Sequence, residues 1–296
     1  ATTEIYTLSL HDALPISRDD DILLEQALMP LDSILLLGCG NMGGAMLAGW
    51  LAGGADPARF TVVDPYLAEA PAGVELLREL PQRRFDAILL GVKPQLLDDV
   101  APALTALAGA ETVVLSILAG VELTSLSARF PAAKAIVRIM PNLAAAIGKS
   151  PVALFDTGLD DAGRAAVTAL MNPLGAPEWL AVESEFDLVT ALAGSGPGFV
   201  YRFIDALAAG AAALGLDSAQ AQRLAVATVE GAALLAAASP HSPAELARRV
   251  ASPGGSTQKG LDVLDEGGAL LTLVQNTLRA AQDRNAEMAA AARSAS

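Results

Sequence analysis

The chain has 296 residues, of which 53% are hydrophobic, and its 19 basic and 33 acidic residues give a formal net charge of -14 at pH 7. This acidic surplus opposes binding to a phosphate backbone, and no uninterrupted apolar run approaches the roughly 18–20 residues of a bilayer span, so we expect neither a nucleic-acid nor a membrane partner. Cys39 is the single cysteine, which excludes an intramolecular disulfide and a cysteine-based metal site and favours a cytoplasmic location.

The first 30 residues form a leader that does not enter the predicted fold. Residues 1–17 lack both the layout of a secretory signal and a clear helical or strand period, and they resemble a translated vector or adapter remnant. We expect residues 1–30 to be disordered and partly artefactual.

Short apolar runs then alternate with amphipathic stretches, a pattern that predicts a parallel α/β sheet because parallel neighbours need crossover connections. We predict a Rossmann-type dinucleotide-binding domain over residues 31–183. Its predicted strands are 34–37, 60–63, 87–90, 113–117 and 135–139, with helices after the first strand and at 68–80, 96–107 and 121–128. A strand at 152–155, a helix at 160–171 and a short strand near Trp179 extend the sheet.

After about residue 183 the strand signals stop. We predict an all-helical domain for oligomerisation and substrate binding over residues 184–296, with helices at 185–193, 197–214, 218–238, 243–250, 257–265 and 268–292. Ser218 and Ser242 are predicted N-caps, and Gly215 is a predicted helix stop. The stretch 199–216 is apolar nearly all round, which predicts burial at a subunit interface.

Three glycines with the spacing G-x-G-x-x-G lie between the first predicted strand and the first helix. Such glycines allow a tight turn and a close backbone approach, so that the helix N-terminus can hold a pyrophosphate. We therefore predict cofactor binding at Gly38, Gly40, Asn41, Met42 and Gly43. The alternative is a glycine turn that only packs a helix against a strand.

Asp64 lies at the end of the second predicted strand, 26 residues after Gly38. A carboxylate there accepts hydrogen bonds from the adenosine ribose hydroxyls and repels a 2′-phosphate, which favours NAD over NADP. The alternative is that Asp64 and Pro65 only start a turn.

Three loops follow the later strands at the edge that faces the ligand crevice of an open α/β sheet. The first holds Gly91, Val92, Lys93 and Pro94, the second Ala119 and Gly120, and the third Asn142. We predict that all three bind the cofactor, with Lys93 at a phosphate or at the nicotinamide ribose and Asn142 at the carboxamide. The alternative for each loop, taken singly, is that these residues only form an ordinary connection between elements.

The loop from Ala251 to Thr257 joins two helices of the second domain. Its hydroxyls and free backbone amides, running into a helix N-terminus, predict an anion site for a small carboxylate. The candidate residues are Ser252, Gly254, Gly255, Ser256 and Thr257. No histidine offers a good general acid, since His11 lies in the leader and His241 between Ser-Pro turns, and no metal-ligand cluster is seen.

Taken together, these residues resemble the pyrroline-5-carboxylate reductase family from about Ser33 to near the C-terminus. The most specific segment is 249–265, and segments 138–142 and 189–197 match further landmarks of the family in the expected order. The resemblance implies a cytoplasmic oxidoreductase of proline biosynthesis that reduces a carboxylate-bearing cyclic imine to L-proline. NADPH and NADH both stay open as cofactor, because Asp64 is not the usual arrangement for NADP.

The resemblance also implies residue roles. Thr257 is expected to hydrogen-bond the imine nitrogen, while the Ser252 hydroxyl and the amides of Gly255, Ser256 and Thr257 hold the carboxylate. Lack of a catalytic histidine agrees with this chemistry, because a protonated imine is already electrophilic. Family members pair through the helical domain, so we expect a homodimer that assembles into a larger homo-oligomer. Gly198 replaces the usual alanine at the start of a long helix.

Two alternatives stay open. A β-hydroxyacid dehydrogenase or related imine reductase shares the two-domain plan, but the hydroxyacid enzymes need a lysine where this chain has Val200, and no lysine occurs between Lys149 and Lys259. A non-catalytic dinucleotide sensor is the other alternative, and the intact loop from Ser252 to Thr257 argues against it.

Overall fold

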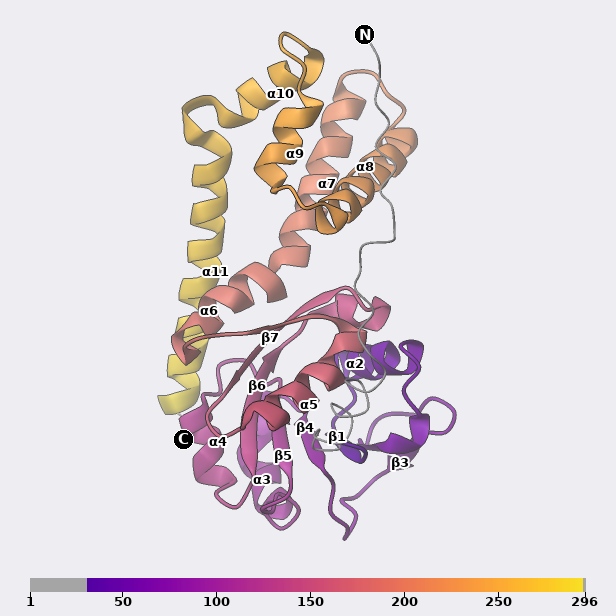
Figure 1. Cartoon of the computed structure of the whole chain (residues 1–296), viewed down its shortest axis with the longest axis vertical. Helices are drawn as coiled ribbons and strands as arrows, with labels where there is room; N and C mark the ends of the chain where they lie inside the picture. The colour runs from indigo at the N-terminus through magenta and orange to yellow at the C-terminus, as the bar shows by residue number, and fades with distance from the viewer. Residues whose placement is uncertain (1–30, 295–296) are drawn as a thin grey trace, which may run out of the picture.

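The structure, a computed structural model, describes residues 31–294, so the predicted leader lies outside the described residues. The chain forms two lobes (Figure 1). One lobe is a sheet with helices on both faces, and the other consists of helices alone. The long C-terminal helix α11 (Ala269–Ser294) runs along both lobes (Figure 1).

One sheet of eight strands has the order β3-β2-β1-β4-β5-β6-β7-β8. Strands β1 to β6 all run parallel to one another. Their order reverses between β1 and β4, and ligands of open α/β sheets bind beyond the strand ends at such a point. The strands are β1 Ile34–Leu37, β2 Phe60–Val63, β3 Glu75–Leu77, β4 Ala87–Leu90, β5 Val113–Ser116, β6 Ala135–Met140, β7 Ser150–Asp156 and β8 Gly175–Trp179.

Helices cover both faces of the sheet, which explains why β1, β2, β4 and β5 are buried at every position. On one face, α2 (Asn41–Ala52) and α5 (Asp161–Met171) contribute to a core that includes Trp50 stacked on Phe60, with ring centroids 5.2 Å apart. On the other face, α3 (Leu97–Thr105) and α4 (Leu123–Arg129) complete a second core. The predicted α/β architecture is confirmed.

The helix predicted at 68–80 is wrong, since the described chain has no helix there and β3 forms at its end. Pro71 and Gly73, the latter with φ +85°, prevent this segment from forming a helix. β7 is a second departure, because it runs antiparallel to β6 rather than parallel. Residues 141–149 are too few for the crossover that a parallel pair requires.

The second lobe contains the helices that the sequence predicts, with ends shifted by one or two residues. They are α6 Phe186–Val189, a π-helical turn η6 Thr190–Gly194, α7 Gly196–Ala213, α8 Ser218–Ala238, α9 Pro243–Val250, α10 Ser256–Asp265 and α11.

The helix ends in this lobe test the predicted caps. Ser242 caps α9, as predicted, by accepting a hydrogen bond from the Glu245 amide. The prediction for Ser218 is wrong, because Asp217 caps α8 through the Gln220 amide. An aspartate one residue earlier already satisfies that amide. Gly215, with φ +111°, ends α7 as predicted.

The helical lobe has very little core of its own. In the described part of α7 to α10, the buried residues are only Ala208, Ala221 and Ala225. Large apolar side chains on the same helices are exposed, among them Tyr201, Phe203, Leu207, Leu224, Leu235 and Val263. Exposed apolar patches of this extent mark interaction surfaces. By length and composition alone α8 could also cross a bilayer, although Arg223 and Glu230 interrupt it.

Candidate active site

The glycine turn after β1 has the geometry that the sequence motif predicts. Gly38 has φ +85°, and a Cβ on it would lie 2.9 Å from the Gly91 carbonyl oxygen. A Cβ on Gly43 would lie 2.7 Å from the Gly38 carbonyl oxygen. Gly38 therefore makes the tight turn, while Gly43 lets α2 approach it closely.

Gly40 differs from the other two glycines because no atom lies within 4 Å of the Cβ position. It is the N-cap of α2 and has no side-chain hydrogen bond to cap the helix. The amides of Asn41, Met42 and Gly43 have no intrahelical acceptors, so they and the helix dipole face this open space. These features fit the pyrophosphate of a dinucleotide.

Asp64 holds the glycine turn from the end of β2. Its Oδ2 accepts a hydrogen bond from the Cys39 amide at 2.9 Å, and its Oδ1 accepts bonds from the Tyr66 and Leu67 amides. Burial raises the pKa of this carboxyl, but the three amide bonds and the charge of Arg78 outweigh burial and leave the pKa below its ordinary value. Asp64 thus starts a turn, and its ribose contact stays a prediction.

Cys39 sits inside this arrangement with a buried side chain. Burial raises the pKa of its thiol, and the nearby Asp64 carboxylate raises it further. The thiol therefore stays protonated and unreactive near neutral pH.

The loop after β4 lies against the glycine turn. The Gly91 amide donates to the Leu37 carbonyl at 2.8 Å, and a Cβ on Gly91 would lie 2.7 Å from the Gly38 carbonyl oxygen. Lys93 is exposed and precedes Pro94, which begins a short 3-10 turn. The structure thus brings Gly91 and Val92 beside the glycine turn, and Lys93 and Pro94 follow them along the chain.

The loop after β5 is packed against the far end of α11. Gly120 has φ +74°, and a Cβ on it would lie 3.2 Å from the Cα of Ala289. Ala119, next to it, is exposed at the carboxyl edge of the sheet. Ala119 therefore faces the solvent of the crevice, whereas Gly120 is also a helix-packing residue, which the sequence did not indicate.

An ion pair between the buried Arg138 and the half-buried Glu183 fixes the same region to the helical lobe. Arg138 Nη1 lies 2.7 Å from Glu183 Oε1, which also accepts a hydrogen bond from the Leu123 amide at the start of α4. The Arg138 guanidinium stacks over the Phe186 ring, 4.1 Å from its centroid. Sequence reasoning missed Glu183, because no local pattern marks a partner 45 residues away.

Asn142 is buried at the end of β6, with its side chain engaged inside the protein. Its Nδ2 donates to the Ala193 carbonyl at 2.9 Å, and its Oδ1 accepts from the Ala144 amide. Asn142 therefore ties β6 to the π-helical turn. Only one Nδ2 hydrogen is left, so the predicted carboxamide contact stays a prediction.

The loop between α9 and α10 has the predicted form of an anion site. Ser252 and Thr257 are exposed, Gly254 has φ +74°, and no side chain caps α10. The Gly255 amide, however, donates to the Ser252 carbonyl at 2.9 Å and closes the turn. The expectation that the Gly255 amide holds the carboxylate needs correction, because that amide is already used.

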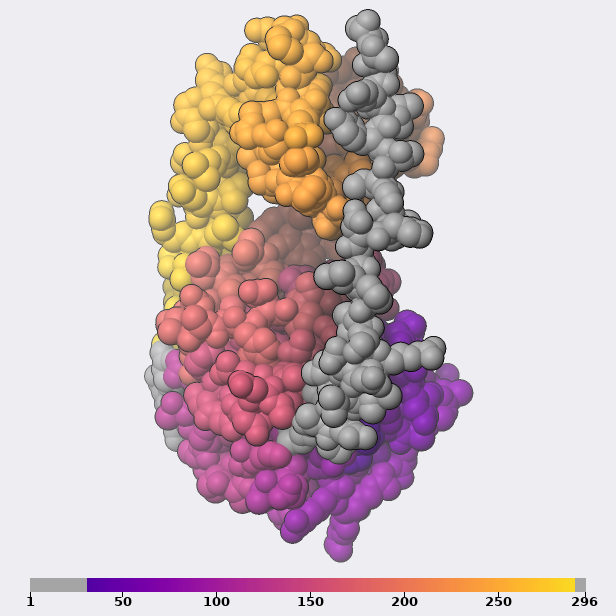
Figure 2. Space-filling view, in the orientation of Figure 1, coloured from indigo at the N-terminus to yellow at the C-terminus, as the bar shows by residue number. Residues whose placement is uncertain are grey.

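The structure does not bring this loop to the glycine turn of its own chain. Helices α9 and α10 lie at the end of the molecule opposite the sheet (Figure 1). In the space-filling view the orange helices form the upper end of the molecule and the sheet lobe forms the lower end (Figure 2). The glycine turn and the hydroxyl-bearing loop, the two halves of the predicted site, thus do not meet within one chain.

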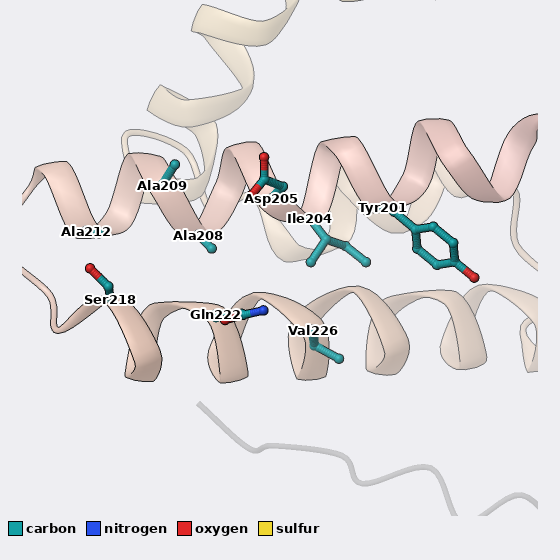
Figure 3. Close-up of a pocket in the computed structure, with 9 residues that line it drawn as sticks. All are labelled: Tyr201, Ile204, Asp205, Ala208, Ala209, Ala212, Ser218, Gln222 and Val226. Carbon is teal, nitrogen blue, oxygen red and sulfur yellow. The ribbon is translucent and has the colours of Figure 1, made fainter.

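A hollow of about 570 Å³ lies between α7 and α8, away from both halves. Figure 3 shows Tyr201, Ile204 and Ala208 on α7 facing Gln222 and Val226 on α8. Because the helices around it expose large apolar side chains, we interpret this hollow as part of an uncovered packing surface rather than as a ligand pocket.

Comparison with known proteins gives one consistent family. Residues 183–288 match the family described as pyrroline-5-carboxylate reductase dimerisation. The chain is 32% identical over 269 residues to pyrroline-5-carboxylate reductase of Pseudomonas aeruginosa, covering 88% of this chain and 98% of that protein. It is 32% identical to the enzyme of the same name from Pasteurella multocida, covering 88% and 98% of the two chains.

Solved structures agree. The structure is similar to a pyrroline-5-carboxylate reductase from Coxiella burnetii with a TM-score of 0.81 and 29% identity, covering 87% of this chain and 98% of that one. The Plasmodium falciparum pyrroline carboxylate reductase, solved with NADP bound, has a TM-score of 0.71 at 21% identity, covers 88% and 99% of the two chains, and shows the shared fold.

Proposed function

The chain belongs to the pyrroline-5-carboxylate reductase family of NAD(P)-dependent oxidoreductases acting on the CH–NH group, and we propose how its residues reduce 1-pyrroline-5-carboxylate to L-proline. The glycine turn with the loops after β4 and β5 holds NADPH or NADH. The loop from Ser252 to Thr257 holds the imino acid. When bound, the reduced nicotinamide supplies a hydride to the imine carbon.

The substrate carboxylate binds at the N-terminus of α10. The Ser252 and Ser256 hydroxyls and the free amides of Ser256 and Thr257 donate hydrogen bonds to it, and the helix dipole favours its negative charge. Gly254 provides the left-handed turn that lets these groups converge, and Gly255 starts the helix. The carboxylate thereby fixes the position of the imine ring.

Thr257 aligns the imine itself. Its hydroxyl oxygen accepts a hydrogen bond from the protonated imine nitrogen and keeps the C=N bond facing the hydride donor. As the hydride adds to carbon, the π electron pair of the C=N bond moves to nitrogen, and the cation becomes a neutral amine. No strong general acid is needed, because the substrate is protonated before the reaction and orientation supplies most of the rate gain.

The single observation that carries the arrangement is the near-absence of a core in the helical lobe. Its buried residues in α7 to α10 are alanines, while leucine, valine and aromatic side chains are exposed. A second copy, paired through the dimerisation region at 183–288, covers that surface and carries its own loop from Ser252 to Thr257 to the crevice of its partner. We propose this exchange because the two halves lie apart within one chain.

The wider expectations are proposals of the same kind. The domain boundary near residue 183 is supported by the last strand, which ends at Trp179. A larger assembly of dimers, the cytoplasmic location and the preference between NADPH and NADH rest on the sequence and the family. Neither the hydroxyacid dehydrogenase nor the sensor is favoured by any contact in the described chain.

Turnover in the oxidative direction tests the function. Proline with NAD or NADP at alkaline pH should yield reduced cofactor, followed by its fluorescence. Thr257→Ala should lower kcat by on the order of 100-fold, since it removes a group that orients the reacting bond. Thr157→Ala, which removes an equally exposed hydroxyl beyond β7, is the matched control and should keep wild-type turnover. Normal turnover in Thr257→Ala would remove Thr257 from the mechanism.

A further inference from the structure

The carboxyl ends of β2 and β3 lie side by side at the adenosine end of the nucleotide crevice. Val63 pairs with Leu77 in the parallel register, so the next residues on the two strands, Asp64 and Arg78, leave the sheet together. The Asp64 amide also donates to the Leu77 carbonyl at 3.2 Å. This places the Arg78 guanidinium against the backbone carbonyl of Asp64, the residue whose carboxylate sequence reasoning assigned to the cofactor ribose.

The Arg78 guanidinium is fixed in place by the loop after β2. Its Nη1 donates to the Asp64 carbonyl at 2.7 Å and to the Leu67 carbonyl at 2.6 Å. Of its five N–H groups, the one on Nε and the two on Nη2 donate to no other group among the described residues. Arg78 is exposed, so this half of the planar fork faces solvent in a set orientation.

Asp64 has little acceptor capacity left for a ribose. A carboxylate has about four acceptor positions, and the amides of Cys39, Tyr66 and Leu67 occupy three of them. One position can accept one hydroxyl, but not the paired 2′- and 3′-hydroxyls that an NAD-selective carboxylate holds. The charge of Asp64 is directed into the glycine turn instead.

We infer that Arg78 binds the 2′-phosphate of NADPH and allows this chain to use NADPH despite Asp64, an inference that rests on the proposed function. A guanidinium presents two N–H groups to two phosphate oxygens in one plane, which a lysine ammonium does not. An arginine near the ribose is also the general solution for a 2′-phosphate in this fold. Arg78 is thus a specificity residue, and it does not take part in hydride transfer.

Equilibrium binding to the full-length protein tests the inference. The probes are NADPH, NADH, adenosine 2′,5′-bisphosphate and AMP, each titrated by calorimetry into wild type, Arg78→Gln and Arg84→Gln. Arg84 is an exposed arginine beside Gly109, so its variant makes the same change in charge away from the crevice. Arg78→Gln should weaken the binding of NADPH and of the bisphosphate by at least about tenfold. The affinities for NADH and AMP should change by less than about twofold. Arg84→Gln should change none of them.

Two results would overturn the inference. If Arg78→Gln weakens the binding of NADPH and of NADH equally, Arg78 only supports the loop after β2 and does not contact the 2′-phosphate. If all four affinities stay as in wild type, it does neither. Failure of the proposed function is distinguishable, because then wild type itself would bind neither dinucleotide and would not oxidise proline.

Discussion

The two glycines that flank the N-terminus of α2 should respond in opposite ways to a single methyl group. In Gly40→Ala the new Cβ meets no atom within 4 Å, and Gly40 has φ -70°, which alanine adopts freely. The free energy of unfolding should therefore fall by no more than about 1 kcal/mol, because alanine is a poorer N-cap than glycine. In Gly43→Ala the Cβ would lie 2.7 Å from the Gly38 carbonyl oxygen, and backbone must move. That overpacking should cost about 1–3 kcal/mol.

Dinucleotide affinity should follow a different pattern from stability. The methyl group of Gly40→Ala enters the space where the backbone approaches a pyrophosphate, so NADPH should bind at least about tenfold more weakly, or about 1.4 kcal/mol. Urea unfolding at fixed protein concentration measures stability, and quenching of protein fluorescence measures binding. Unchanged affinity in Gly40→Ala, or wild-type stability in Gly43→Ala, would refute the assignment of the turn.

Three further predictions concern stability. Because the folded-state pKa of Asp64 lies below its ordinary value of 3.8, the stability that this carboxylate provides is fully present above that pH and is lost as pH falls through the lower pKa. The difference in unfolding free energy between wild type and Asp64→Asn should thus be constant near neutral pH and shrink below pH 3.8, and a difference independent of pH would contradict it. Gly198→Ala should stabilise α7 by about 1 kcal/mol, seen as a higher urea midpoint, because no atom lies within 4 Å of the new Cβ. Glu183→Ala should lower the free energy of unfolding in urea by about 3–5 kcal/mol, since it leaves the buried guanidinium of Arg138 unpaired. A loss under about 1 kcal/mol would show that the ion pair does not fix the sheet lobe to the helical lobe.

Elements with a strong local pattern could be predicted from the sequence. The strand 34–37 is a short, wholly apolar run, and the glycine turn after it has a characteristic spacing, and both signals depend only on neighbouring residues. The prediction of a helix at 68–80 is wrong because the apolar residues fit a helical period, whereas Pro71 and Gly73 prevent a helix. The prediction of Ser218 as an N-cap is wrong because the adjacent Asp217 is an equally suitable cap residue.

The parts of the site that depend on distant residues could not be predicted. No sequence pattern near Arg138 predicts its ion pair with Glu183, and none near Gly120 predicts its contact with Ala289. The bonds of Asp64 to backbone amides, which direct its charge away from the ribose, also depend on how the glycine turn is folded. The position of the Ser252 loop relative to the crevice is a property of two chains and is absent from any local pattern.

Mixed dimers show whether the glycine turn of one subunit works with the Ser252 to Thr257 loop of the other subunit. Gly40→Val and Thr257→Ala each inactivate a different half of the site. In coexpressed, purified mixtures, half of the dimers carry one subunit of each kind, and one of their two sites is intact, so about a quarter of wild-type activity should return. Activity no higher than the mean of the two variants measured separately would contradict a site shared between subunits.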